Sequence, residues 1–249
     1  MKPRILAIVG PTAVGKTSLS LQVAARLHGE IISADSMQVY RGMDIGTAKP
    51  TLAERSLIPH HLIDVVDPGE SFSAADYQRL ARAAVDDILE RGRLPIFSGG
   101  TGLYIRAAID DYNFTASENN PTVRKKLQQE LQEAGLPALY TRLEQVDPRV
   151  ASRLHATDQR RIIRALEVYE TTGRALSSWE SEKDIKNALY DVLIIGLLRP
   201  REELYARIDA RVEQMFVTGL LEEARQLFAQ GISLVALQAL GYKELLAYL

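Results

Sequence analysis

The pattern of hydrophobic and polar positions begins with a short buried strand, a glycine-rich loop and a helix. Residues 5–9 form a continuous apolar run, which is typical of a parallel strand covered on both faces. After the loop at residues 10–17, apolar side chains recur at helical spacing, at Leu19, Val23 and Leu27. Residues 30–35 (EIISAD) then predict a second strand. This order of elements predicts a parallel α/β sheet.

A helix and a strand continue this pattern. Ser73 stands three residues before Asp76, which is the spacing of a helical capping box. Apolar side chains then follow one helical face, at Tyr77, Leu80, Ala81, Ala84, Val85 and Ile88. Residues 94–97 predict another short buried strand, and a glycine-rich turn follows it. We therefore expect the sheet to continue through this region.

The pattern changes between residues 113 and 187. Asn, Ser and Pro open this stretch, helical spacing fills it, and no convincing strand pattern occurs in it. We interpret residues 113–187 as an inserted all-helical subdomain. The remaining residues, 1–112 and 188–249, then form a discontinuous core.

Strand and helix patterns return after the insert. Residues 192–198 (VLIIGLL) predict a strand that rejoins the sheet. Pro200 begins a helix, and we assign its buried side to Leu204, Ile208, Val212 and Phe216. A further helix is expected at residues 220–230. The chain then ends on the apolar residues 246–249, from which we expect the natural protein to continue.

The amino-acid composition indicates the cellular compartment in which the protein acts. The chain has no cysteine, which excludes disulfides, thiolate metal sites and thiol nucleophiles and fits a reducing cytoplasm. No apolar stretch approaches the length of a membrane span, and the first residues do not resemble a signal peptide. We therefore expect a soluble cytoplasmic protein. The net charge of −2 lacks the basic excess of dedicated nucleic-acid-binding domains, so the location of charge matters more than its sum.

Residues 10–17 match the phosphate-binding pattern G-x-x-x-x-G-K-[ST] in full, between a buried strand and a helix. They are Gly10, Pro11, Thr12, Ala13, Val14, Gly15, Lys16 and Thr17. Glycines let backbone N–H groups point toward a phosphate chain, the helix N-terminus adds positive potential, and Lys16 supplies a full charge. The Thr17 hydroxyl is a candidate ligand of Mg²⁺. The pattern predicts a P-loop NTPase-like α/β fold that binds a diphosphate or polyphosphate, without identifying the compound.

Asp35 stands at the expected C-terminal end of the second strand. Ligands of open α/β sheets bind beyond these strand ends, so Asp35 should face the same crevice as Lys16. The carboxylate could hold Mg²⁺ through water or act as a general base. It could also simply cap the segment that follows it. These alternatives stay open on the residues alone.

Beyond the P-loop, the sequence resembles the bacterial tRNA dimethylallyltransferases, also called isopentenyl-diphosphate:tRNA transferases. The resemblance rests on blocks that occur in family order along the whole chain. They are DSMQVY at 35–40, GMDIGTAKP at 42–50, PHHL at 59–62, FSAA at 72–75, GGTGLY at 99–104, RALEV at 164–168 and GYKE at 241–244. Family members continue beyond the last block with a helix and a basic segment that this sequence does not contain.

The resemblance implies a prenyl transfer. Dimethylallyl diphosphate donates its allylic carbon to N6 of adenosine, directly 3′ of the anticodon, in tRNAs that read codons beginning with U, and diphosphate leaves. Asp35 is then the general base, Thr17 holds Mg²⁺ as the cofactor, and residues 10–17 hold the donor diphosphate. Arg211 corresponds to an arginine that neutralises the leaving group, and Arg207 would share its helix face.

The resemblance also implies a set of contacts to the anticodon stem-loop of tRNA. These residues are Asp35, Ser36, Met37, Gln38, Thr101, Arg124, Arg160, Arg161 and Arg164. Residues 149–164 hold five arginines and one acid, as an RNA-backbone contact should, although a solvated helix face would look the same. We favour a structural role over a metal site for His60 and His61, because adjacent side chains usually point in different directions. We expect a monomer.

Three other functions would use some of the same features. A P-loop small-molecule kinase has the same strand–loop–helix beginning, and the insert could imitate its lid. A related transferase acts on free adenine nucleotides, but the basic run in the insert favours a polymer. A non-catalytic RNA-binding module would not need Lys16, Thr17 and Asp35 together. Incubation with Mg²⁺ and either ATP or dimethylallyl diphosphate separates the kinase from the prenyltransferase. A kinase protects or turns over ATP, and a prenyltransferase does so with dimethylallyl diphosphate.

Overall fold

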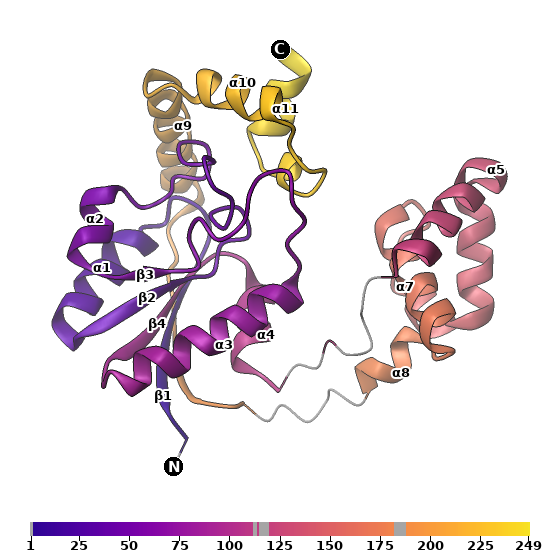
Figure 1. The fold of residues 1–249 in the computed structure, drawn as a ribbon, viewed down its shortest axis with the longest axis horizontal. Coiled ribbons are helices and arrows are strands. Elements are labelled where there is room, and N and C mark those ends of the chain that lie inside the picture. Colours follow the sequence, from indigo (N-terminus) through magenta and orange to yellow (C-terminus); the bar gives the residue numbers. More distant parts are fainter. Residues whose placement is uncertain (1, 112–113, 115–119, 182–187) are drawn as a thin grey trace. The chain divides into compact units, whose positions relative to one another are not determined.

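The computed structural model describes residues 2–111, 114, 120–181 and 188–249 and divides them into two compact units. The core unit comprises Met1–Asp111 and Ala188–Leu249, and the helical unit comprises Tyr112–Asn187 (Figure 1). The second unit is thus inserted between two segments of the first. Among the described residues, no helix combines the length and the apolar character that crossing a membrane requires.

A five-stranded parallel sheet forms the centre of the core unit, and this confirms the predicted fold class. Its order is β3-β2-β4-β1-β5. The strands are β1 (Arg4–Val9), β2 (Gly29–Ser33), β3 (His60–His61), β4 (Leu94–Gly99) and β5 (Asp191–Gly196). Val9 pairs with Gly99 and Ser33 with Ser98, so β1, β2 and β4 end at the same edge of the sheet. Loops that follow these strands therefore meet at one place.

Helices cover the two faces of this sheet. The helices of the core unit are α1 (Lys16–Leu27), α2 (Leu52–Leu57), α3 (Ala74–Glu90), α4 (Gly102–Ile109), α9 (Arg201–Val217), α10 (Leu220–Gln230) and α11 (Tyr242–Tyr248), with a 3-10 turn at Ala236–Gln238. On one face, Ile32 and Phe97 pack with Tyr77 of α3 and Tyr104 of α4. On the other face, Ile8, Ile31 and Ile96 pack with α1. Burying one such side chain stabilises the fold by roughly 1.5–3 kcal/mol.

The ends of α3 and α10 agree with the sequence patterns. The Ser73 hydroxyl accepts a hydrogen bond from the Asp76 backbone N–H at 3.2 Å, and the Asp76 carboxylate accepts one from the Ser73 N–H at 3.1 Å. This is the predicted capping box, which satisfies two donors that the first turn leaves open. The helix expected at residues 220–230 is α10.

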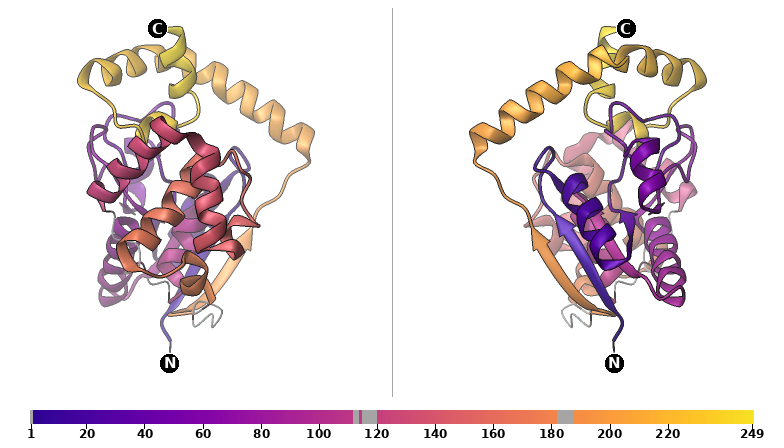
Figure 2. Two further views of the ribbon diagram at one scale, coloured as in Figure 1. Left: turned by 90° about the vertical axis from the view of Figure 1, so that its right-hand side faces the viewer. Right: turned by 90° about the vertical axis from the view of Figure 1, so that its left-hand side faces the viewer.

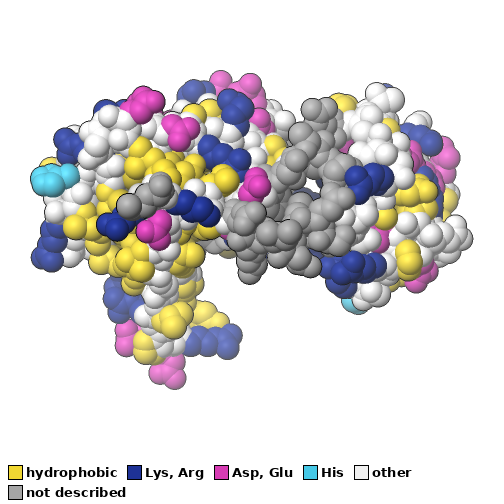
Figure 3. Space-filling model, turned by 90° about the horizontal axis from the view of Figure 1, so that it is seen from below, with side chains coloured by type: hydrophobic (Ala, Val, Ile, Leu, Met, Phe, Trp, Pro, Cys, Tyr) yellow, Lys and Arg dark blue, Asp and Glu magenta, His cyan; other side chains and the backbone are white. Residues whose placement is uncertain are grey.

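The predicted buried side of α9 holds for Leu204 and Ile208 but is wrong for Val212 and Phe216. Val212 is 42% exposed and Phe216 is 50% exposed, whereas Arg211 and Met215 are partly buried with Leu204 and Ile208. The four predicted residues are each four positions apart, and on a helix of 3.6 residues per turn such positions move gradually around the axis. Positions that stay on one face alternate spacings of four and three residues. Figure 2 shows α9 running diagonally from β5 toward α10, beside the sheet and not across it. In Figure 3, hydrophobic side chains gather on the surface of the core unit.

The helical unit contains helices without a strand among its described residues. They are α5 (Pro121–Val146), α6 (Pro148–Ala151), α7 (Gln159–Thr172) and α8 (Leu176–Ser181). Helix α5 bends where Gly135 adopts a φ of 79°, two residues before Pro137. Leu127, Leu139 and Leu143 of α5 are fully buried against Ile162 and Leu166 of α7. The unit therefore has a hydrophobic core of its own.

Candidate functional site

A cleft of about 960 Å³ opens at the sheet edge where β1, β2 and β4 end. Parallel α/β sheets place ligands at this edge, beyond the carboxyl ends of their strands. Four segments that follow or join strands, and one helix, supply most of the lining: residues 10–13 and 15–18, 35–38, 46–48 and 50, 98–101, and the α9 residues Arg207, Ala210 and Arg211. All of these belong to the core unit. The topology therefore brings together residues that lie up to about two hundred positions apart in the sequence.

The P-loop forms the wall of the cleft that follows β1. Gly15 has a φ of 112°, a conformation that residues with a Cβ rarely adopt, and Lys16 begins α1 directly after it. The Lys16 ammonium donates hydrogen bonds to the carbonyl oxygens of Gly10 at 2.9 Å and Pro11 at 2.8 Å. This curvature and the first turn of α1 have the backbone arrangement in which P-loops bind anions, and the predicted contact with a phosphate chain stays a prediction.

The predicted donor-binding residues line this wall with one exception. Gly10, Thr12, Ala13, Gly15, Lys16 and Thr17 line the cleft. The Val14 side chain is buried, and its carbonyl oxygen accepts a hydrogen bond from Arg199 Nε at 3.1 Å. Only the backbone N–H of Val14 is therefore suited to the predicted contact.

Two cations and one carboxylate influence each other inside the cleft. Burial lowers the pKa of Lys16, the nearby Asp35 carboxylate opposes this shift, and Arg211 lowers it further. Burial likewise lowers the pKa of Arg211, again against the attraction of Asp35. The arrangement leaves an excess of positive charge beside the P-loop, and this favours a ligand with several negative charges.

Asp35 lies two residues beyond the end of β2, so the predicted strand is two residues too long. Its Oδ1 accepts a hydrogen bond from the Met37 backbone N–H at 2.9 Å, which closes a local turn and orients the carboxyl group. Asp35 therefore caps the segment that follows it, as one of the alternatives predicted, but that segment is a turn and not a helix. Asp35 also lines the cleft, so the local bond and a chemical role are compatible.

Gly99 allows the chain after β2 to cross the end of β4. A Cβ at Gly99 would lie 2.1 Å from the Ala34 carbonyl oxygen, so no other residue fits there without a shift of the backbone. The crossing lets the Thr101 N–H donate to the Ala34 oxygen at 3.0 Å. Thr101 Oγ1 in turn accepts a hydrogen bond from the Ser36 N–H at 3.1 Å. Thr101 therefore lies beside the Asp35–Ser36 loop, and its predicted contact with the substrate stays a prediction.

Gln38 links this loop to the next wall of the cleft. Its side-chain oxygen accepts a hydrogen bond from Ser33 Oγ at 3.0 Å. Its side-chain nitrogen donates to the carbonyl oxygens of Thr47 at 3.3 Å and Ala48 at 3.4 Å. The amide thus has protein partners at both ends, while Gln38 and Met37 both line the cleft. Their predicted contact with tRNA stays a prediction.

Arginines of α9 face the P-loop. Arg207 Nε donates a hydrogen bond to the Ala13 carbonyl oxygen at 2.8 Å, and Arg211 lines the cleft one turn further along. The predicted common face of these two arginines is confirmed. Sequence reasoning missed Arg199, which holds the Val14 carbonyl and pairs with Glu203 at 3.1 Å. Arg199 lies two residues before α9 begins, so helical spacing could not have linked it to Arg207.

Sequence reasoning also missed several polar residues of the cleft. They are Ser20, Ser33, Thr47, Glu54, His60, Ser98 and Gln238. Burial lowers the pKa of His60, which keeps its ring neutral at physiological pH, and its Nδ1 lies 2.7 Å from the Ile58 carbonyl oxygen. His61 instead lies 2.7 Å from Glu30, so the two rings have different partners. Among the described residues, no group of three His, Asp or Glu side chains is placed to hold a metal ion.

The arginines predicted to contact tRNA divide into two kinds in the helical unit. Arg124 and Arg164 each pair at 2.8 Å with Glu167, whose side chain is 1% exposed. Burial alone would raise the pKa of Glu167, but the hydrogen bonds from Arg164 and Arg124 outweigh it and lower the pKa. Arg161 pairs with Asp158 at 3.5 Å on the surface.

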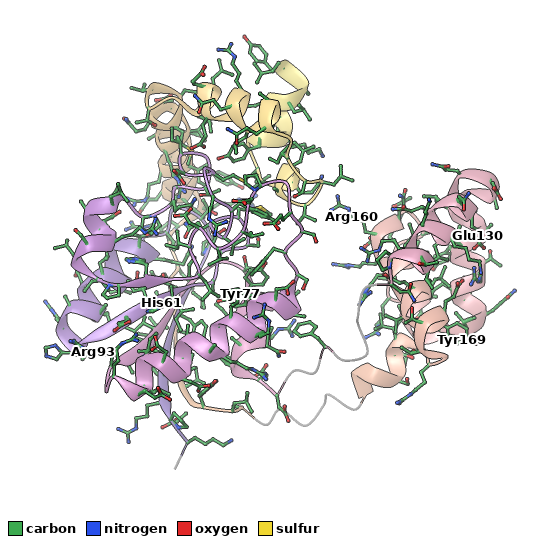
Figure 4. The ribbon with its side chains drawn as sticks, viewed as in Figure 1. His61, Tyr77, Arg93, Glu130, Arg160 and Tyr169 are labelled. Atoms are coloured by element: carbon green, nitrogen blue, oxygen red, sulfur yellow. The ribbon has the colours of Figure 1, made fainter. Side chains whose placement is uncertain are left out.

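Arg160 is exposed near the start of α7. Figure 4 shows it on the opposite side of the helical unit from Glu130 and Tyr169. The structure therefore separates arginines that maintain the fold from those on the surface. A spacing of three residues between Arg164 and Glu167 was the only local signal of this difference.

The fold and the cleft define a P-loop α/β protein with a cationic site beside a carboxylate. The sequence model described as IPP transferase matches residues 38–249 of this chain. The chain belongs to this family, whose curated relatives are named tRNA dimethylallyltransferase. It is 51% identical to the relative from Geobacillus kaustophilus and 50% identical to that from Anoxybacillus flavithermus, covering 100% of this chain and 79% and 78% of theirs.

Solved structures of related enzymes are similar as well. The full-length tRNA isopentenylpyrophosphate transferase from Bacillus halodurans has 46% sequence identity and a TM-score of 0.69, covering 99% of this chain and 77% of that chain. A eukaryotic dimethylallyltransferase acting on tRNA has 34% identity and a TM-score of 0.84, covering 99% of this chain and 63% of that chain. The family predicted from the ordered sequence blocks is therefore confirmed.

Proposed function

We propose that this protein is a tRNA dimethylallyltransferase that transfers the dimethylallyl group of dimethylallyl diphosphate to N6 of the adenosine directly 3′ of the anticodon. The observation that carries the proposal is that the P-loop, Asp35 and Arg211 line the same cleft. A site for a diphosphate beside a proton acceptor supports group transfer to an amine. Family membership supports the identity of the donor and the acceptor.

The P-loop side of the cleft would bind the donor. Backbone N–H groups at the start of α1 would hold the diphosphate, and Lys16 would exchange its bonds to loop carbonyls for bonds to phosphate oxygens. Arg211 would stabilise the negative charge that grows on the leaving diphosphate. The excess positive charge described above supports this assignment.

The residues present fit a magnesium ion held largely by the donor. Thr17 lines the cleft at the first turn of α1, and Mg²⁺ is commonly held by one or two protein groups together with phosphate oxygens and water. The Thr17 hydroxyl would be a direct ligand. When bound, the ion would neutralise part of the diphosphate charge.

The Asp35 side of the cleft would bind the acceptor. The bond between N6 of adenosine and the allylic carbon forms, the bond between that carbon and the diphosphate oxygen breaks, and diphosphate leaves with the electron pair. The N6 proton passes to the Asp35 carboxylate as general base. Ser36 and Thr101 lie beside Asp35 and would position the base, which must leave the anticodon-loop stack to enter the cleft.

The helical unit would contact the tRNA backbone. The exposed Arg160 supports this role most directly, while Arg124 and Arg164 would contribute mainly by keeping their helices together. All residues that line the cleft come from one core unit, which supports activity as a monomer. A tRNA substrate supports a cytoplasmic location.

The test is mass spectrometry of nucleosides from a tRNA incubated with this protein, Mg²⁺ and dimethylallyl diphosphate. We expect a dimethylallyl adenosine from a tRNA with adenosine 3′ of the anticodon. A matched tRNA with guanosine at that position should stay unmodified, and AMP should be a poor acceptor. Parallel reactions contain ATP in place of the prenyl donor. Turnover of ATP to a phosphorylated small molecule, with unmodified tRNA in the first reaction, would replace the proposal with a kinase.

A further inference from the structure

The loop at residues 42–50 forms the wall of the cleft next to Gln38. Gly46, Thr47, Ala48 and Pro50 line the cleft, and the Gln38 amide holds the carbonyl groups of Thr47 and Ala48. This wall therefore continues the acceptor side that begins at Asp35. Its shape depends on the contacts that fix the loop from behind.

Glu223 of α10 holds three successive backbone N–H groups of this loop. Its Oε2 accepts hydrogen bonds from the N–H groups of Asp44 at 2.9 Å and Ile45 at 2.8 Å. Its Oε1 accepts one from the Gly46 N–H at 3.1 Å. Bonds to an ionised carboxylate are roughly twice as strong as bonds between neutral groups. One side chain thus fixes the direction of three consecutive peptide groups.

Tyr242 of α11 completes this contact. Its hydroxyl donates to Glu223 Oε1 at 2.5 Å, and its side chain is fully buried. Burial and the Glu223 carboxylate raise the pKa of Tyr242, so the phenol keeps its proton and remains a donor. A Cβ at Gly46 would lie 2.6 Å from the Tyr242 ring, so the ring packs directly on the loop backbone.

A second charged contact holds a different part of the same loop. The Lys49 side chain is 3% exposed and pairs with Asp44 at 2.5 Å and with Asp64 at 2.6 Å. It also donates a hydrogen bond to the Tyr40 carbonyl oxygen at 2.8 Å. These bonds tie the loop to its own neighbours in sequence. The Glu223–Tyr242 pair ties it to α10 and α11.

We propose that Glu223 and Tyr242 are positioning residues that set the acceptor wall of the cleft by holding the backbone of Asp44–Ile45–Gly46 in place. This inference rests on the proposed function for the identity of the acceptor. The pair touches the loop and not the reacting atoms, so its loss should weaken productive binding of tRNA. The P-loop lies on the donor side, and its affinity for the donor should be unaffected.

Steady-state kinetics of Glu223→Gln and Tyr242→Phe test the proposal. We expect the KM for tRNA to rise about tenfold in Glu223→Gln and severalfold in Tyr242→Phe, because each loses charge-assisted hydrogen bonds. The kcat and the affinity for dimethylallyl diphosphate should stay within about twofold of the original protein. Glu222→Gln is the matched control, since Glu222 is exposed on the same helix and should leave all constants unchanged.

Hydrogen exchange gives a readout that does not depend on the reaction. Glu223→Gln should accelerate exchange of the backbone amides of Asp44, Ile45 and Gly46, and Glu222→Gln should not. If wild-type protein transfers no prenyl group while these amides respond, the proposed function fails and the contact stands. Unchanged amide exchange, an unchanged KM for tRNA in an active enzyme, or an equal loss of donor affinity would overturn the positioning role. Tyr242→Phe keeps the ring and still tests it if Glu223→Gln does not fold.

Discussion

The two units of this protein use arginine in different ways. In the core unit, Arg207 and Arg211 lie at the cleft, where one bonds a P-loop carbonyl and the other shares its surroundings with Lys16 and Asp35. In the helical unit, Arg124 and Arg164 converge on the buried Glu167 carboxylate. A basic run in sequence therefore does not by itself identify a binding surface. The positive charge available to a ligand is that of the arginines that the fold does not pair with acidic side chains.

Replacing Asp35 should have the largest effect and defines the chemistry of the core unit. We expect Asp35→Ala to lower kcat by about 10²–10⁴-fold, the range for removing a general base. Binding of a dimethylallyl diphosphate analogue should persist, because the P-loop wall is intact. Single-turnover transfer and analogue binding measure the two effects separately. Near-normal turnover would remove Asp35 from the role of base.

Replacing Glu167 should have the next largest effect and should act on stability. Glu167→Ala leaves two arginines and the Asn120 N–H without their buried carboxylate, which should cost about 2–4 kcal/mol of unfolding free energy. Urea unfolding followed by circular dichroism measures it. Exposed Glu144→Ala on α5 is the control and should change stability little.

The same carboxylate gives a pH dependence with a defined sign. The pKa of Glu167 is lowered from its ordinary value of 4.5, so its contribution is present above about pH 4.5 and is lost as the pH falls through the lower folded pKa. The stability of Glu167→Ala should accordingly lose less between pH 5 and pH 3 than that of the original protein. Parallel loss in both proteins would contradict the assignment.

Replacing Lys16 should weaken the donor side of the core cleft. We expect Lys16→Met to reduce affinity for inorganic diphosphate by about 10–100-fold, the range for losing bonds to a charged group. Because burial lowers the pKa of Lys16, affinity should begin to fall at a pH below its ordinary value of 10.5. Asp35 opposes that shift, so Asp35→Ala should move the decline to lower pH. Calorimetric titration across alkaline pH checks both effects, and a decline that moves upward in Asp35→Ala would refute this electrostatic coupling.

Replacing Arg160 should have the smallest effect and sharpens the comparison between the units. We expect Arg160→Ala to weaken tRNA binding severalfold and to reduce the slope of log affinity against log salt by about 1. Its stability should stay within about 0.5 kcal/mol of the original. Arg124→Ala should show the opposite pattern, with a larger loss of stability. Equal salt slopes for Arg160→Ala and the original protein would exclude a phosphate contact at this position.

Local pattern was sufficient for much of the fold and for part of the site. The capping box at Ser73 and the helix at residues 220–230 follow from short-range spacing, and the structure contains both. The P-loop could be predicted because its glycines, Lys16 and Thr17 are contiguous and their backbone conformation depends on neighbours in sequence. Periodicity misled at α9, where Val212 was expected inside and Arg211 is the partly buried residue.

The sequence by itself determined the parallel sheet, the helical insert and the phosphate-binding loop, because these depend on local conformational preference and on the alternation of buried and exposed positions. Only the tertiary structure decided which distant groups meet. The Glu223 carboxylate reaches Gly46 across 177 positions, and Arg207 reaches Ala13 across 194. No local signal encodes such distances, because they follow from strand order and helix packing. The pairing of Glu167 with Arg124 was decided in the same way.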